Sequence, residues 1–209
     1  MGRRRYATAE EIEEAEEYLR RYLATAESRL AWLREESART GGPTPDQLDY
    51  SRDSLVPLWE WAIGRFRLRP ADAPLDFVDL GRQGRYYRPH DADLPMWFGR
   101  RAVQAPDGWS DETLALIDGL IYYLAETVLR AVPGAKWEVW HADVKNHIDE
   151  NQPVLTGFHT HVDLFMPMMN LAGQVGWMVK PDRPNPYRIP PPTPFDLRDW
   201  FDAIVADAA

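Results

Sequence analysis

Two proline-rich stretches decide where this chain can form regular structure. Five prolines and four glycines fall between residues 67 and 109, and seven prolines fall between residues 180 and 194. Proline removes a backbone donor and fixes φ, so neither stretch can be a helix interior or a central strand. We therefore predict a long irregular excursion over 67–109 that packs on the body of the protein. Over 180–194 we predict an extended, proline-rich strap.

The segments outside these stretches carry apolar residues at three- and four-residue spacing, the periodicity of an amphipathic helix. The longest begins at a capping box formed by Thr8 and Glu11 and runs to about residue 39, before Gly41 and Gly42. The same spacing predicts helices after Ser54, after Ser110 and across 163–178. A last helix over 195–207 is expected behind Thr193.

Two short segments, 136–142 and 153–158, have the aromatic and β-branched composition of strands. Together with the helices they predict an α+β fold, in which several amphipathic helices pack on a small antiparallel sheet. At 209 residues, one domain over 1–209 is enough to bury a core. Within it we expect an N-terminal helix over 8–40, an insertion over 67–109, the strap and the C-terminal helix.

Charge and composition exclude several classes of function. A net charge of −9 disfavours a nucleic acid partner, which needs clustered basic side chains. The absence of cysteine excludes disulfides, thiol catalysis and cysteine-ligated metals. The chain begins without the apolar segment of a signal peptide, and no apolar run approaches the length of a membrane span. We therefore expect a cytoplasmic protein with no membrane partner.

The histidines form the pattern with the most chemical content. Four of the five fall between residues 141 and 161, and in an extended segment His159, His161 and Asp163 would share one face. With His141 they are candidate ligands for a divalent metal such as zinc. The alternative, which we favour, is that they are loop histidines beside the end of a strand, and then no cofactor is expected.

Aromatic residues of the excursion are the candidate binding surface. Trp97, Phe98 and Trp109 are predicted to contact a protein partner, since exposed aromatic side chains often anchor interfaces. The alternative is that all three pack in the core. The acidic charge suits a basic protein partner, and the long N-terminal helix offers a surface for pairing with a second copy of the chain.

Three segments together resemble a broad group of uncharacterised bacterial proteins. The resemblance implies a fold of helices and a small sheet, and some of these proteins look like immunity or accessory proteins of polymorphic toxin systems. Ala125 stands where glycine is commoner in the group. The matching segments are Leu48-Asp49-Tyr50-Ser51 through Ser54-Leu55, Tyr122-Tyr123-Leu124-Ala125-Glu126 followed by Trp137-Glu138-Val139, and Asn151-Gln152-Pro153-Val154-Leu155.

The sequence leaves two functions open. We expect a non-enzymatic protein-binding module, either immunity-like or an accessory subunit of a larger bacterial toxin or defence system. The alternative is a small metal-dependent hydrolase that uses the histidine and aspartate cluster, with Glu126 or Glu138 as the base. The sequence assigns no catalytic residue.

Overall fold

The computed structural model describes residues 8–79, 85–89, 94–101, 108–141, 149–180, 185 and 188–208, with the backbone alone for 77–79, 85–89 and 99–101. Its strands are β1 (Leu75–Asp79), β2 (Arg85–Pro89), β3 (Lys136–Trp140) and β4 (Gln152–Thr156). Its helices are α1 (Ala9–Ala24), α2 (Ala26–Arg39), α3 (Leu55–Ile63), α4 (Met96–Arg101), α5 (Asp111–Ala131), α6 (Phe165–Val179), α7 (Asp196–Ala206) and the short 3-10 helix η1 (Pro45–Gln47). The predicted α+β class is confirmed.

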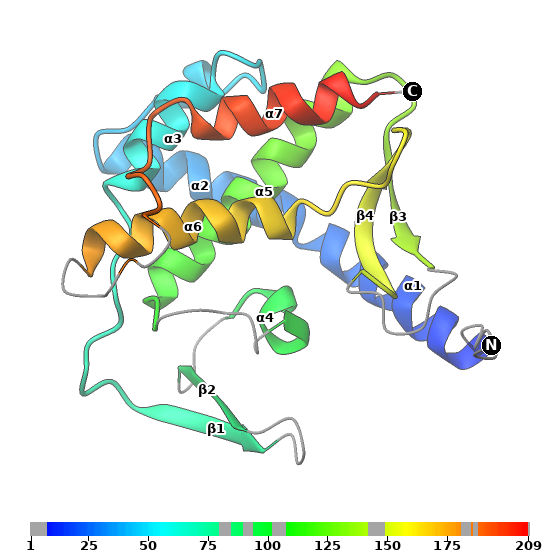
Figure 1. Cartoon of the computed structure of the whole chain (residues 1–209), viewed down its shortest axis with the longest axis horizontal. Coiled ribbons are helices and arrows are strands. Elements are labelled where there is room, and N and C mark those ends of the chain that lie inside the picture. Colours follow the sequence, from blue (N-terminus) through cyan, green and yellow to red (C-terminus); the bar gives the residue numbers. More distant parts are fainter. Residues whose placement is uncertain are drawn as a thin grey trace.

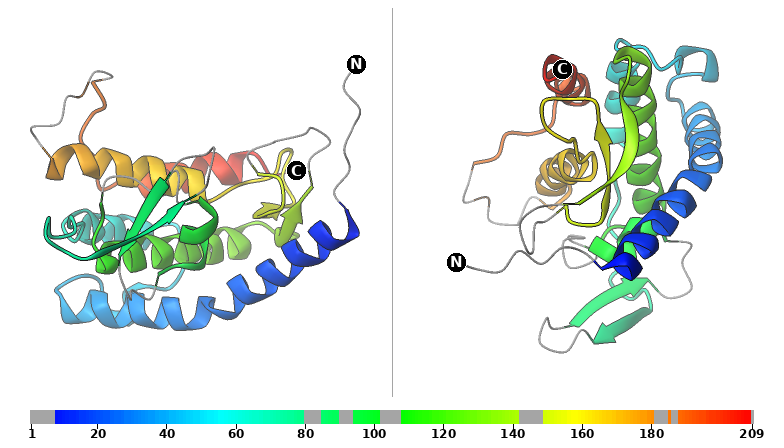
Figure 2. Two further views of the ribbon diagram at one scale, coloured as in Figure 1. Left: turned by 90° about the horizontal axis from the view of Figure 1, so that it is seen from below. Right: turned by 90° about the vertical axis from the view of Figure 1, so that its right-hand side faces the viewer.

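Helix α5 lies at the centre of the molecule, with α2 on one side and α6 and α7 on the other (Figures 1 and 2). It begins where the sequence predicts, because the Ser110 side chain accepts a hydrogen bond from the Thr113 N–H. Most of its residues are buried, as expected of a helix that is apolar on nearly every side. At Gly119 an added Cβ would lie 3.2 Å from the Cβ of Leu33, so glycine allows α2 to pack closely against α5.

The turn before α3 is fastened to α5 by Tyr123. The Tyr123 Oη accepts a hydrogen bond from the Tyr50 N–H at 3.0 Å and lies 2.7 Å from the Ser54 Oγ. The ring of Tyr50 stacks on that of Tyr123, with 4.7 Å between centroids, and the Asp49 Oδ1 accepts the Ser51 N–H. These residues join the turn to the central helix.

The single helix predicted over 8–40 is interrupted at Thr25. The Tyr122 hydroxyl reaches from α5 and donates to the Tyr22 carbonyl oxygen at 2.7 Å, and the Thr25 Oγ1 donates to the same oxygen at 2.8 Å. Side chains that insert into the backbone hydrogen-bond ladder are a common cause of helix bends. The chain therefore continues as two helices, α1 and α2, that together curve around α5 (Figure 2).

The strands form two separate antiparallel pairs. Strand β3 pairs with β4, with Lys136 opposite Thr156 and Trp140 opposite Gln152, and this hairpin packs on α1. Strand β1 pairs with β2 and lies below the helical body in Figure 1. The excursion over 67–109 is thus more regular than predicted, since it contains β1, β2 and α4.

Two predictions near the C-terminus are only partly met. Residues 188–194 form neither helix nor strand, as expected of the strap, whose residues 181–184, 186 and 187 lie outside the described residues. Helix α7 begins at Asp196 and not at 195, and Thr193 does not cap it in the predicted direction. Instead the Thr193 N–H and hydroxyl both donate to the Asp196 carboxylate, at 2.8 and 2.5 Å.

The two tyrosines at the bend, Tyr22 and Tyr122, predict how the stability of the fold changes at alkaline pH. Burial raises the pKa of both Tyr22 and Tyr122, and the negative charge of Asp118 raises each further. In the unfolded chain both tyrosines would ionise at about pH 10, whereas in the folded state they stay neutral at that pH. The stabilisation is therefore complete below about pH 10 and is lost above it, by about 1.4 kcal/mol per pH unit for each tyrosine.

Urea unfolding between about pH 8 and pH 11 would measure this slope. Tyr122→Phe should lower stability at neutral pH by roughly 0.5–1.5 kcal/mol for each hydrogen bond lost, since the hydroxyl bonds to the Tyr22 carbonyl oxygen and lies 2.9 Å from the Thr25 Oγ1. It should also make the alkaline decline less steep, since one ionising group is removed. An unchanged slope in the variant would contradict this assignment.

Candidate functional site

A pocket lies where the N-terminal helix, the β3–β4 hairpin and the helices α4, α5 and α6 meet. The space in it that a water molecule can reach is about 20 Å³, which is roughly room for one water molecule. It is therefore a small gap between packed side chains. The lining residues are Tyr18, Tyr22, Trp97, Ile121, Trp137, Gln152, Pro153, Asp163, Leu164 and Phe165.

One wall of the pocket is built from tyrosines of α1. Tyr18 and Tyr22 are four residues apart, so they lie on the same face of the helix, and their rings are nearly parallel at 6.3 Å. Tyr22 also stacks on Tyr122 of α5 at 4.7 Å, and Trp137 of β3 meets its ring edge-on at 5.8 Å. Contacts with three different elements therefore fix the Tyr22 ring.

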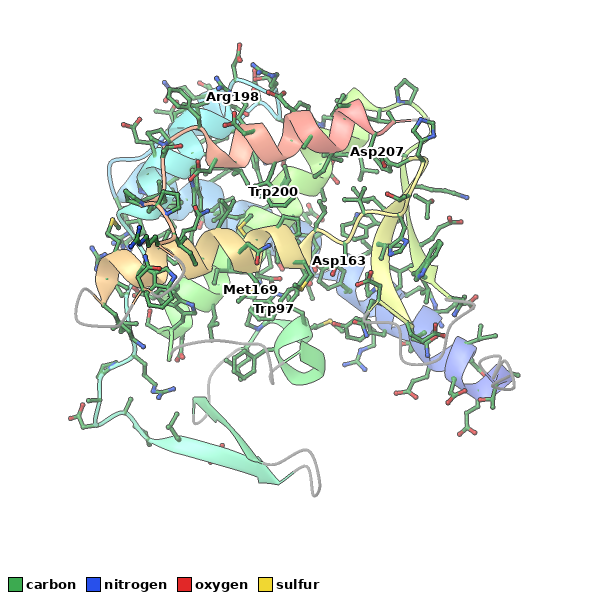
Figure 3. The ribbon with its side chains drawn as sticks, viewed as in Figure 1. Trp97, Asp163, Met169, Arg198, Trp200 and Asp207 are labelled. Carbon is green, nitrogen blue, oxygen red and sulfur yellow. The ribbon has the colours of Figure 1, made fainter. Side chains whose placement is uncertain are left out.

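Another part of the lining is Trp97, which reaches from α4 toward the helical body (Figure 3). Its Nε1–H donates to the Asp118 Oδ1 at 2.9 Å, and the other oxygen of Asp118 lies 3.2 Å from the Arg29 Nε. The Trp97 ring packs against Phe165 with 5.1 Å between centroids. A buried carboxylate thus sets the position of the indole.

Asp163 is the charged residue among those that line the pocket. It lies immediately before α6 (Figure 3), and its Oδ1 accepts a hydrogen bond from the Phe165 N–H at 3.0 Å. A carboxylate at a helix N-terminus is stabilised by the helix dipole and by such bonds. The lining of the pocket therefore combines aromatic rings with one carboxylate.

The three aromatic residues predicted to contact a partner are buried. Trp97, Phe98 and Trp109 are 4%, 6% and 2% exposed, and all three belong to the hydrophobic core. Trp109 packs edge-on against Phe66 at 5.3 Å. The core-packing alternative therefore describes them, because burying such large apolar surfaces stabilises the fold more than exposing them would. Trp97 alone among the three also lines the pocket.

The predicted metal ligands take different partners. The His141 Nδ1 lies 3.0 Å from the Asn151 Oδ1, and the exposed His159 donates its backbone N–H to the Asp207 carbonyl oxygen. The His161 Nε2 lies 2.8 Å from the Asp149 Oδ2, and its ring stacks on Trp140 at 3.9 Å. Asp163 is at the pocket and caps α6.

Over the described ranges, no group of three or more histidine, aspartate or glutamate side chains is arranged to hold a metal ion. His147 lies outside those ranges. The two candidate bases are engaged elsewhere, since Glu126 lies 4.0 Å from the Arg130 Nε and Glu138 hydrogen-bonds to Thr156. Lys136 and Thr156 lower the pKa of Glu138, opposite to the shift that a base working near neutral pH requires. The metal-dependent alternative stays a prediction.

No family model, curated protein or solved structure matches this chain. In the part of the chain that the structure describes, every helix is too short or too polar to cross a bilayer. The proposed function therefore rests on the charge of the chain and on its exposed residues.

Sequence reasoning did not assemble this pocket. The sequence selected Trp97 and Asp163 for other roles. The two tyrosines of α1 carried a readable signal, because aromatic residues four positions apart form one surface on a helix. Their neighbours in the pocket come from elements about a hundred residues away, which no local pattern reveals.

Proposed function

We propose that this chain is a non-enzymatic protein-binding module that recognises a basic protein partner, as an immunity-like protein or an accessory subunit of a bacterial toxin or defence system would. The acidic surface of the chain, with its exposed glutamates on α1, carries the proposal. Complementary charge is a common way in which proteins select their partners.

The charge around the pocket supports a basic partner. The chain has a net charge of −9, and Glu13, Glu14 and Glu16 of α1 are exposed. Glu14 is one helical turn before Tyr18, so its carboxylate lies on the approach to the pocket wall. Electrostatic complementarity of this kind accelerates association and selects among partners.

The proposal predicts that the glutamates of α1 contribute to binding. The full chain would first be purified without a tag from cells that express it, and the protein that co-purifies in fixed stoichiometry identified. With the two purified proteins, the triple variant Glu13→Gln, Glu14→Gln, Glu16→Gln should associate about 10-fold more slowly at low salt, because electrostatic steering is reduced.

A second triple variant, Asp46→Asn, Asp53→Asn, Glu60→Gln, is the matched control. It removes the same charge from exposed positions in η1, just before α3 and within α3. Helix α3 lies at the far end of the molecule from the start of α1 (Figure 1). Its association rate should stay within about 2-fold of the wild type. Equal slowing by both triples would show that net charge alone acts. A chain that purifies with no protein partner would overturn the proposal.

A further inference from the structure

We propose that the outer edge of β3 is a docking surface for an extended basic segment of the partner, which adds to the β3–β4 hairpin as a further strand. This inference rests on the proposed function, because it takes the partner to be a basic protein. It names the surface of the chain that the partner contacts and the conformation that the contacting segment adopts.

Two residues of β3 direct their backbone polar groups away from β4. Leu155 of β4 exchanges both of its backbone hydrogen bonds with Val162, each at 2.9 Å, so it points away from β3. In an antiparallel pair the residue opposite such a position also points outward, and Trp137 lies opposite Leu155. Directions alternate along a strand, so the N–H and C=O groups of Val139 point outward as well.

Further observations agree with an open edge. Val139 lies opposite Pro153, whose missing N–H suits a position that forms no bond across the pair. Within the described residues, the backbones of Trp137 and Val139 form no hydrogen bond beyond the pairing with β4. Strand β3 is the outer strand of the hairpin, on the side away from α6 (Figure 1). Such an edge is a template for another strand and a common binding surface for extended peptides.

Charge identifies the occupant as a basic segment and not as a second copy of the chain. The first turns of α1 extend past β3 on the same side (Figures 1 and 2), and Glu13, Glu14 and Glu16 are exposed there. Pairing the β3 edges of two copies would bring two of these acidic helices together, which the repulsion of like charges disfavours. An added strand with basic side chains would instead lie beside carboxylates of opposite charge.

Amide hydrogen exchange of the full chain tests whether the edge is open. Glu138 lies between the two outward residues and opposite Val154, so its N–H bonds to β4. We expect the Glu138 N–H to exchange about 10-fold or more slowly than the N–H groups of Trp137 and Val139. NMR spectra at low protein concentration would measure the three rates. Equal protection of all three would overturn the inference, because the edge would already be covered.

Synthetic peptides test the nature of the occupant. They are acetyl-Lys-Val-Lys-Val-Lys-Val-Lys-amide, its counterpart with glutamate in place of lysine, and the basic peptide with every backbone nitrogen methylated. Shifts of the Trp137 and Val139 amide signals would report binding. The basic peptide should bind about 10-fold more tightly than either other, since one lacks the complementary charge and one lacks the donors of a strand. Failure of the basic peptide to bind, or equal binding of either other, would overturn the inference.

Val139→Pro closes the edge in the chain itself. Proline removes the outward N–H and is tolerated on edge strands, so the β3–β4 pairing should be kept while the basic peptide binds about 10-fold more weakly. Val139→Thr is the matched control, because threonine is also β-branched and keeps the N–H, and its affinity should stay within about 2-fold of the wild type. Undiminished binding to Val139→Pro would contradict the proposed edge. If this variant does not fold, the methylated peptide gives the same test on the unaltered chain.

The natural partner separates this inference from the proposed function. If the partner binds Val139→Pro as tightly as the wild type, the binding function stands and the β3 edge is not its docking surface. If the basic peptide adds to the edge but no protein co-purifies with the chain, the edge is supported and the proposed function is overturned. Protection of Trp137 and Val139 that rises with the concentration of the chain alone would make a second copy the occupant and overturn the assignment to a basic segment.

Discussion

Replacing Asp118 with alanine is expected to lower the free energy of unfolding by about 3–5 kcal/mol, the usual loss when one partner of a buried ion pair is removed. Asp118 is 2% exposed and pairs with Arg29, which is 17% exposed. The variant would leave the Arg29 guanidinium without this carboxylate and the Trp97 indole N–H without its acceptor. Urea unfolding followed by tryptophan fluorescence would measure the change.

The Arg52–Asp202 pair provides the matched control. These side chains also form a close ion pair, but they are 47% and 39% exposed. Solvent screens such a pair and the two long side chains lose freedom in forming it, so Asp202→Ala should produce little measurable change in stability. The loss in free energy of unfolding for Asp118→Asn should fall between those for Asp118→Ala and Asp202→Ala. Asparagine keeps an acceptor for the Trp97 N–H but removes the charge. Similar effects at the two sites would show that burial does not set the contribution of Asp118.

Replacing Trp109 with alanine is expected to lower the free energy of unfolding by about 3–5 kcal/mol, as other buried tryptophans do. The Trp109 ring packs on Phe66, which in turn packs on Trp59 at 5.9 Å. The lost indole would leave a cavity at one end of this row of rings. The Trp109 Nε1 has no hydrogen-bond partner among the described residues. Trp109→Phe should therefore lower the free energy of unfolding considerably less than Trp109→Ala does.

Phe195→Ala is the control for an aromatic residue at the surface. Phe195 is 48% exposed, and its replacement should change stability by about 1 kcal/mol or less. Thermal and urea unfolding of the three variants would be compared. If Trp109→Ala were as mild as Phe195→Ala, Trp109 would not be a core residue and its predicted role at a partner surface would regain support.

Local sequence patterns were sufficient to predict most of the helices and strands. The capping pattern at Thr8 and the cap at Ser110 each mark a real helix start. The strand over 136–142 was predicted from its aromatic and β-branched residues, and it corresponds to β3. Such signals succeed because capping and strand formation depend on neighbouring residues, and the neighbours are visible in the sequence.

The interruption at Thr25 could not be predicted in the same way. Its cause is the hydroxyl of Tyr122, which is about a hundred residues away and reaches the Tyr22 carbonyl only in the folded state. The β1–β2 hairpin was different, because its signal was present. Aromatic and β-branched residues flank Gly81 and Gly84, a pattern typical of a hairpin with a longer loop. The prolines on either side led to the prediction of an irregular segment.

The β3–β4 hairpin connects two distant parts of the chain. It packs on α1, and the loop after β4 is joined to residues 207 and 208, through the bridge between Phe158 and Ala208 and the bond from His159 to Asp207. Contacts between residues so far apart in sequence form slowly, because a long loop must close first. During synthesis, the loop after β4 can therefore take these contacts only after residues 207 and 208 have been added.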